Sequence, residues 1–288
     1  MPTFQEELQT KLSVIEDLPT LPAIILELER MLHNDMVSAA EVGVVIEEDP
    51  AIAASVLRVA NSAMFYSSVS GTIVSIRDAI VRLGFKEIHQ VVSAAAFIRA
   101  FGKLARRVDP QHFWKRSLST AVAGRVIANA ITKQVSFYEE DAYVAGLLHD
   151  IGLLVLDQLF AEAYDQVEAA MDGQTVSWAE KEREVLGLDH GQIGGLLLDN
   201  WNLPEIVVEA VRWHNQPDHA KQDAQITAQG VQLAELVAET LDTEEVSEEQ
   251  MQALLAHPSW EIFGIDQARA AKVLEDTRSQ SNPVFALV

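Results

Sequence analysis

Apolar residues recur every three or four positions along most of the chain, which is the spacing of one face of an α-helix. Residues 85–101 show this clearly, because Ile88, Val91 and Val92 fall on the same face. The alternating apolar and polar pattern of a half-buried β-strand is nearly absent. The pattern therefore predicts an all-α protein.

Capping residues mark where several of these helices begin and end. Ser38, followed three residues later by Glu41, matches a capping box. Asp49 and Pro50 are typical of an N-cap and a first helical residue. Gly84 follows an apolar run and is expected to end its helix in a left-handed conformation.

The helices are expected to form two lobes. Residues 102–110 are polar and basic and end in a proline, which favours a boundary there. We place an N-terminal helical lobe at residues 1–108 and a second helical lobe at residues 109–288. The tail from Ser279 onward has weak helix signals and is predicted to be loose, although some of its apolar residues are suited to docking.

Composition excludes several classes of protein. The chain has 288 residues, 49% of them hydrophobic, and no cysteine, so disulfides, thiolate catalysis and cysteine zinc sites are excluded. Its net charge of −22 disfavours nucleic acid and anionic lipid as direct partners. The first residues do not resemble a signal peptide, and no apolar run has the length of a membrane span. We expect a cytoplasmic protein.

A short window near the lobe boundary gathers basic residues against this acidic background. A solvated helix face is the favoured interpretation of the window. The alternative is a contact for an acidic partner or a nucleotide phosphate. Its members are Lys103, Arg106, Arg107, Lys115, Arg116 and Arg125.

Three histidines stand beside glycine or polar residues at predicted helix ends. His149 adjoins Asp150, and an imidazole nitrogen next to a carboxylate oxygen suits a metal ion. His190 and His214 follow about forty and then twenty-four residues later, so three helices can bring them together. The same residues also fit buried hydrogen-bonded groups with no metal, and spacing alone does not decide between the two.

Several motifs together resemble one family. They lie at residues 18–22, 46–52, 57–62, 75–84, 113–117, 146–152, 189–194 and 198–204. These motifs follow the order of that family over about residues 15–215, and by them the chain resembles the HDOD domain, a relative of the HD phosphohydrolases.

This resemblance implies an all-α, bacterial, cytoplasmic protein of signal transduction. HDOD domains are usually regarded as regulatory or scaffolding modules, and many lack the full metal set of their hydrolase relatives. On this basis His149, Asp150, His190 and His214 correspond to a metal site.

The chain departs from the catalytic pattern at three places. Catalytic HD proteins carry a histidine before the serine that matches Ser117, and Arg116 stands there instead. A guanidinium cannot ligate a metal and repels one. Where relatives with extra ligands have a His-His pair, this chain has His214 and Asn215. The closing aspartate of the family corresponds at best to Glu235.

We therefore expect a vestigial site with no catalytic residue and no cofactor. In this hypothesis an ion pair of Arg116 with Asp150 or with Asp141 fills the space of the lost ligand. The alternative is a metal-dependent phosphohydrolase that acts on a nucleotide or phosphodiester and uses Mn, Fe, Ni, Zn or Mg.

The function we expect is binding rather than catalysis. The partners implied by the family are signalling proteins on separate chains, such as a sensor kinase, a response regulator or a cyclic-dinucleotide enzyme. A further possibility is that a cleft between the lobes binds a small effector near Arg116 and the basic window.

Overall fold

The computed structural model describes most of the chain. It covers residues 4, 7–8, 10, 21–32, 34, 36–65, 71–101, 107–171, 175–243 and 246–288. Within these residues every regular element is a helix and none is a strand, which confirms the all-α prediction. Contacts divide the chain into a smaller unit, Pro19–Lys103 with Ser279–Val288, and a larger unit, Leu104–Arg278 with Met1–Leu18. The predicted lobes, 1–108 and 109–288, assign both chain ends differently.

The smaller unit is built around helix α6, whose middle is almost wholly buried. Helices α2, α4 and α5 contact α6, and α3 contacts α2, α4 and α5. Small residues at positions 93–96 of α6 leave room for these neighbours. The elements are α2 (Ala23–Leu32), α3 (Ala39–Glu47), α4 (Pro50–Ala60), α5 (Ile76–Leu83) and α6 (Phe85–Phe101).

The predicted caps of this unit are confirmed. Ser38 and Glu41 form the reciprocal bonds of a capping box at the start of α3. Asp49 accepts hydrogen bonds from the first backbone N–H groups of α4, with Pro50 as the first helical residue. Gly84 ends α5 with the expected positive φ, 83°, which glycine adopts without strain, although its ψ of 161° lies outside the left-handed helical region.

The prediction of a loose tail from Ser279 is wrong. Helix α17 (Gln267–Val284) continues through this segment, and a 3-10 turn, η2 (Phe285–Leu287), follows it. Val284 and Leu287 are buried, and the Arg58 guanidinium donates to the Ala286 carbonyl. The turn packs on α4 and α6, so tertiary contacts order a segment whose local sequence signals are weak.

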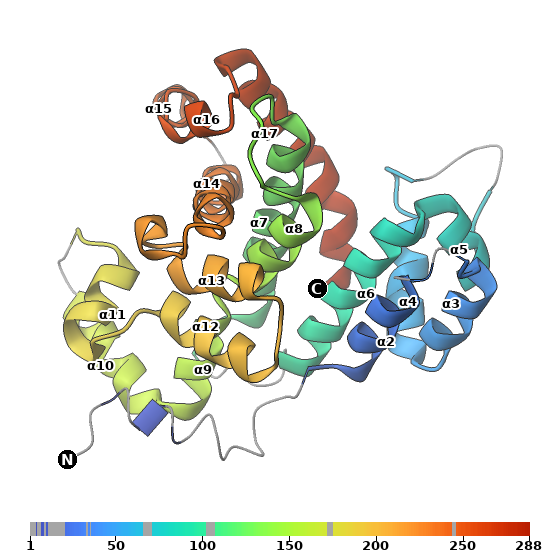
Figure 1. Cartoon of the computed structure of the whole chain (residues 1–288), viewed down its shortest axis with the longest axis horizontal. Coiled ribbons are helices and arrows are strands. Elements are labelled where there is room, and N and C mark those ends of the chain that lie inside the picture. The colour runs from blue at the N-terminus through green and yellow to red at the C-terminus, as the bar shows by residue number, and fades with distance from the viewer. Residues whose placement is uncertain are drawn as a thin grey trace. The chain divides into compact units, whose positions relative to one another are not determined.

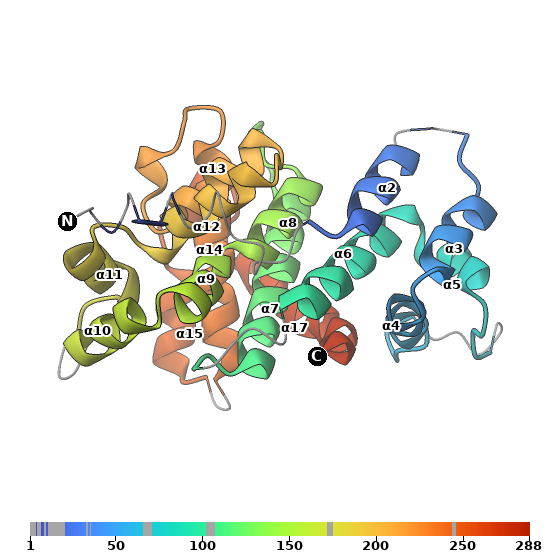
Figure 2. The ribbon, with the colours of Figure 1, turned by 90° about the horizontal axis from the view of Figure 1, so that it is seen from below.

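The larger unit is centred on α7, which lies beside α8 and α14 (Figure 1). Helix α12 packs between α9 and α13, and α9 and α12 are also neighbours when the unit is seen from below (Figure 2). The elements are α7 (Pro110–Ala130), α8 (Glu139–Leu148), α9 (Ile151–Leu159), α10 (Ala161–Met171), α11 (Trp178–Leu186), α12 (His190–Asn200), α13 (Glu205–Trp213), η1 (Pro217–His219), α14 (Gln225–Asp242), α15 (Glu248–Leu255), α16 (Ser259–Ile262) and α17.

Contrary to the expectation from the sequence, one stretch of the larger unit, Glu139–Leu159, is long and apolar enough to cross a membrane by composition. It comprises α8 and α9, and 78% of its most apolar window is buried inside the protein. This is the character of core helices in a globular protein.

Candidate metal centre

The junction of α8 and α9 supplies the first two residues of the centre. His149 ends α8 and Asp150 precedes α9, as the sequence predicts, and their exposed fractions are 0% and 4%. Gly152, in the first turn of α9, lets this helix approach α12 closely. A Cβ atom at Gly152 would lie 1.9 Å from the His190 carbonyl oxygen, so a side chain there would separate the two helices.

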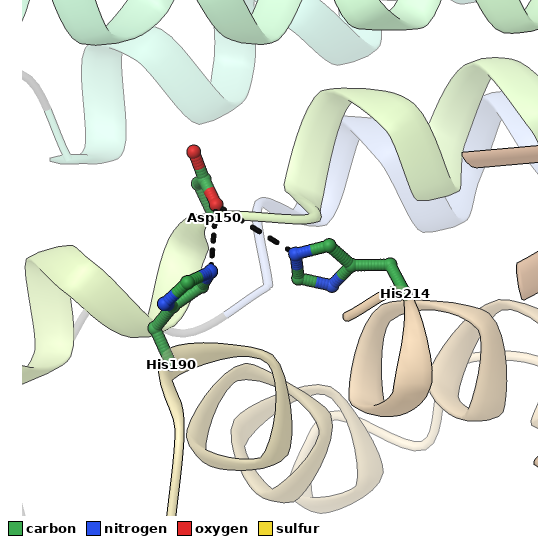
Figure 3. Close-up of side chains that lie close together, drawn as sticks. All are labelled: Asp150, His190 and His214. Carbon is green, nitrogen blue, oxygen red and sulfur yellow. Dashed lines mark ion pairs between the residues drawn. The ribbon is translucent and has the colours of Figure 1, made fainter. Parts of the chain in front are cut away.

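Two further helix ends supply the other histidines. His190 is the first residue of α12, which begins with a capping box formed by Asp189 and Gln192. His214 directly follows α13, and a Cβ atom at Gly191 would lie 2.9 Å from its ring. Glycines thus allow separate helix ends to converge, and Figure 3 shows the side chains of His190 and His214 turned toward Asp150.

The converging side chains place nitrogen and oxygen atoms around one point. The Asp150 carboxylate lies 3.3 Å from His149 Nε2, 3.1 Å from His190 Nε2 and 3.9 Å from His214 Nε2. Glu235 of α14 approaches from another side, 3.8 Å from His149 Nε2 and 4.0 Å from His214 Nε2. The structure therefore brings together all four predicted metal-site residues and the glutamate expected to replace the family's aspartate.

Two of the rings are fixed by backbone carbonyls. His149 Nδ1 lies 2.8 Å from the Gly146 carbonyl oxygen, and His214 Nδ1 lies 2.8 Å from that of Val211. An Nδ1–H that donates to a carbonyl leaves Nε2 as the atom that faces the centre. Fixed rings of this kind are the usual arrangement of histidines that ligate metals.

The charged groups of the centre shift one another's pKa values. Burial raises the pKa of Asp150, but His149 and His190 outweigh burial and hold the pKa well below its ordinary value. Burial lowers the pKa of His190, but Glu182 and Asp150 outweigh it, so this pKa is well above its ordinary value. Burial lowers the pKa of His214. Asp150 Oδ1 and His190 Nε2 lie 3.1 Å apart, and each favours the charged form of the other.

Arg116 of α7 enters the same centre, where it is paired with carboxylates. Its Nη2 lies 2.6 Å from Glu235 Oε1, 2.9 Å from Glu239 Oε1 and 3.7 Å from Asp150 Oδ2. The predicted pair with Asp150 is therefore present but is the longest of the three. The alternative partner, Asp141, does not pair with Arg116, and α14 supplies two glutamates instead. Burial lowers the pKa of Arg116, but the three carboxylates outweigh it and raise this pKa.

The side chains fit a divalent metal ion by the chemistry of their donors. His149 Nε2 and Asp150 Oδ1 are buried and have no partner that meets hydrogen-bond geometry within the described part of the chain. Asp150, His190 and His214 each offer an atom within 4.8 Å of the others, as do His149, Asp150 and Glu235. Imidazole and carboxylate donors together suit Mn, Fe, Ni or Zn.

Two hollows in the larger unit open onto the centre. The volume of one is about 460 Å³ and that of the other about 300 Å³. Arg116, Trp178 and His190 line both of them. Both hollows therefore adjoin residues of the centre, as a site for a small molecule requires.

The basic window is not one solvated face, which corrects the favoured interpretation. Arg125 is buried, with its guanidinium 5.8 Å from the centre of the Tyr143 ring. Arg107 is partly exposed and pairs with Asp165 at 2.7 Å. Lys103 and Arg106 lie outside the described residues. The helical turn of α7 points Arg116 and Arg125 to different surroundings, so the window does not act as a single patch.

The sequence did not single out Glu182 or Trp178, which also belong to the centre. Glu182 of α11 is fully buried and accepts from His190 Nδ1 at 2.6 Å. The indole N–H of Trp178 donates to the other oxygen of Glu182 at 2.9 Å. The available signal was a tryptophan and a glutamate four residues apart on one helix face, shortly before His190.

The pattern of the HDOD domain family matches residues 18–217. The chain belongs to the HDOD family. Residues 146–152 and 189–194 carry the convergence just described, so these two motifs of the HDOD domain are explained by the close helix packing and the ligand atoms they provide.

Solved structures share the HDOD fold. A "Putative phosphohydrolase" from Shewanella amazonensis SB2B is 27% identical, with a TM-score of 0.77, and the match covers 98% of both chains. An HDOD domain protein with unknown function from Geobacter sulfurreducens is 23% identical, with a TM-score of 0.79, over 98% of this chain and 97% of that one.

A curated relative is longer than this chain. The "Uncharacterized protein" of Treponema pallidum (strain Nichols) is 25% identical over 244 residues, which are 84% of this chain and 46% of the relative. The chain therefore spans about half the length of that relative.

Proposed function

We propose that this HDOD protein is a regulatory module that does not hydrolyse phosphodiesters, although its HD-like centre can hold one divalent metal ion. The observation that carries the proposal is the position of Arg116. Its permanent charge lies among Asp150, Glu235 and Glu239, the carboxylates available to neutralise added cations. A guanidinium in this position opposes the binding of a further cation.

The residues that would hold the ion are His149, Asp150, His190 and His214. A bound divalent ion would supply Lewis-acid polarisation of a phosphoryl oxygen and would lower the pKa of a coordinated water. Glu235 lies close to these donors but is paired with Arg116 at 2.6 Å, so it is not free to act as a base toward water. This proposal replaces the expectation of a centre without a cofactor.

The module acts, in this proposal, through contacts with other signalling proteins in the cytoplasm. A sensor kinase, a response regulator or a cyclic-dinucleotide enzyme on a separate chain is the class of partner that membership of the HDOD family favours. Affinity capture from the native host, followed by mass spectrometry, tests this part. Recovery of only unrelated housekeeping proteins would argue against it.

The catalytic part is tested with bis(p-nitrophenyl) phosphate and added Mn²⁺, together with metal analysis by ICP-MS. We expect about one ion per chain and no turnover above the His149→Ala variant. Arg116→His should bind Mn²⁺ more tightly, since it removes a charge and adds a ligand. Lys115→His on the same helix is the matched control and should leave Mn²⁺ binding unchanged. Wild-type turnover that His149→Ala abolishes would refute the proposal.

The second candidate is a metal-dependent phosphohydrolase. It is favoured by the three histidine Nε2 atoms that face Asp150 and by the name of the Shewanella relative. A centre with fixed rings and two adjoining hollows is suited to hold a small phosphoester. The same turnover assay separates the two candidates, since only the hydrolase needs His149 for product formation.

A further inference from the structure

A line of hydrogen bonds leads from the hollows to His190, the ring that lies next to Asp150. Trp178, which lines both hollows, donates its indole N–H to Glu182 Oε1 at 2.9 Å. Glu182 Oε2 accepts from the backbone N–H of His190 at 2.8 Å and from its Nδ1 at 2.6 Å. His190 Nε2 in turn lies 3.1 Å from Asp150 Oδ1.

The Glu182 carboxylate lies where an unpaired charge would be unfavourable. It is a fully buried carboxylate, and burying one is costly unless charged or polar groups pair with it. Its hydrogen bonds go to His190 and to Trp178. His149 and His214 are held by neutral carbonyls, so His190 is the ring of the centre that a carboxylate holds.

We infer that Glu182 and Trp178 are positioning residues for the centre, a role that rests on the proposed metal site. Glu182 fixes the ring of His190 with Nε2 directed at Asp150 and makes this nitrogen a stronger ligand. Trp178 holds the free oxygen of Glu182, so that the carboxylate keeps one orientation. Helix α11, which contributes no ligand itself, thereby determines how well the centre binds an ion.

The first test is Mn²⁺ affinity, measured by the EPR signal of free Mn²⁺ in titrations of the full chain. Glu182→Ala should weaken binding by about 10- to 100-fold, the usual range for outer partners of metal ligands. Glu182→Gln should fall between wild type and Glu182→Ala, because its amide oxygen still accepts from Nδ1–H but carries no charge. Trp178→Phe should show the smallest loss, since the ring remains and only the N–H is removed.

The matched control is Glu184→Gln on the same helix. Glu184 is exposed and pairs with Lys181, so the same chemical change there should leave Mn²⁺ affinity at the wild-type value. An equal loss in Glu184→Gln and Glu182→Gln would mean that the net charge of α11 controls affinity, and this would overturn the inference.

The second test uses protein without metal and is independent of the proposed function. In ¹⁵N-labelled wild type we expect a downfield Nδ1–H proton of His190, as for a short bond to a carboxylate. Glu182→Gln should move this resonance upfield, and Glu184→Gln should not. An unchanged resonance would overturn the inference, even if Glu182→Ala fails to fold.

The two proposals fail in different ways. If wild type binds no Mn²⁺ while the His190 resonance responds to Glu182→Gln, the metal site is wrong and the positioning of His190 stands. If wild type binds Mn²⁺ and both Glu182→Gln and Trp178→Phe bind it equally well, the metal site stands and the positioning role is refuted.

Discussion

Two aspartates, one in each unit, directly precede a helix, and their carboxylates make different contacts. Asp49 precedes α4, and its Oδ1 accepts from the backbone N–H of Ala51 at 3.0 Å and of Ile52 at 3.3 Å. Asp150 precedes α9 but makes no side-chain capping bond, and its carboxylate faces His149 and His190 instead.

The difference is that α4 is stabilised by a side-chain cap and α9 is not. A capping side chain contributes about 1 kcal/mol, and Asp49 supplies this to α4. Helix α9 forgoes the same contribution, although an aspartate stands where it could cap. Natural proteins break local rules mainly at functional sites, so the missing cap is itself a sign that the Asp150 carboxylate serves the centre.

Replacing each aspartate by alanine should separate the two roles, with the largest expected effect at Asp150. Asp150→Ala leaves Arg116 and His190 without their shared carboxylate, and loss of a buried partner of this kind costs about 3 to 5 kcal/mol. Asp49→Ala removes a cap and a partly exposed ion pair with Arg99, and should cost only about 1 to 2 kcal/mol. Urea unfolding of both variants measures the two costs. Equal losses would mean that Asp150 is an ordinary helix-end residue.

Two helical glycines give the next contrast. Gly152→Ala places a Cβ against the His190 backbone, and overpacking of this kind should destabilise the protein by about 2 to 3 kcal/mol. Gly43→Ala in α3 meets its nearest neighbour at 3.8 Å, so it should stabilise by about 0.5 to 1 kcal/mol through helix propensity. Thermal unfolding of the two variants is the measurement. A tolerated Gly152→Ala would mean that α9 and α12 do not need their close approach.

The smallest expected effect concerns pH and the capping box of α3. The hydrogen bonds from Ser38 lower the pKa of Glu41 below 4.5. Because the folded pKa lies below the unfolded value, this stabilisation is present above pH 4.5 and is lost as pH falls through the folded pKa. Urea midpoints of wild type and Ser38→Ala should therefore differ more at neutral pH than in acid. A difference that stays constant with pH would show that Glu41 takes no part in the cap.

The sequence predicts local features well where the local chain determines them. The caps at Ser38, Asp49 and Gly84 depend on residues within four positions, and all three are confirmed. Helix ends at His149 and His190 are likewise marked by neighbouring glycine and polar residues. Their convergence was expected from the number of helices and from the family resemblance, and the structure brings them together.

Features that depend on distant packing were missed. Glu182 lies among Glu180, Lys181 and Glu184, so its local sequence is that of a solvent-exposed helix, yet it is fully buried beneath His190. Arg116 was expected to pair with one aspartate, but two glutamates of α14, more than a hundred residues away, are its nearer partners. The sequence around a charged residue does not indicate whether the folded protein will bury it.

The docking of η2 on α4 and α6 has a consequence for synthesis on the ribosome. Residues 19–103 leave the ribosome before Val284 and Leu287, which complete their core. The core of the smaller unit therefore stays partly exposed while about 180 intervening residues are synthesised. Closing so long a loop also slows folding. Chaperones that shield nascent chains would accordingly have most to protect in the smaller unit.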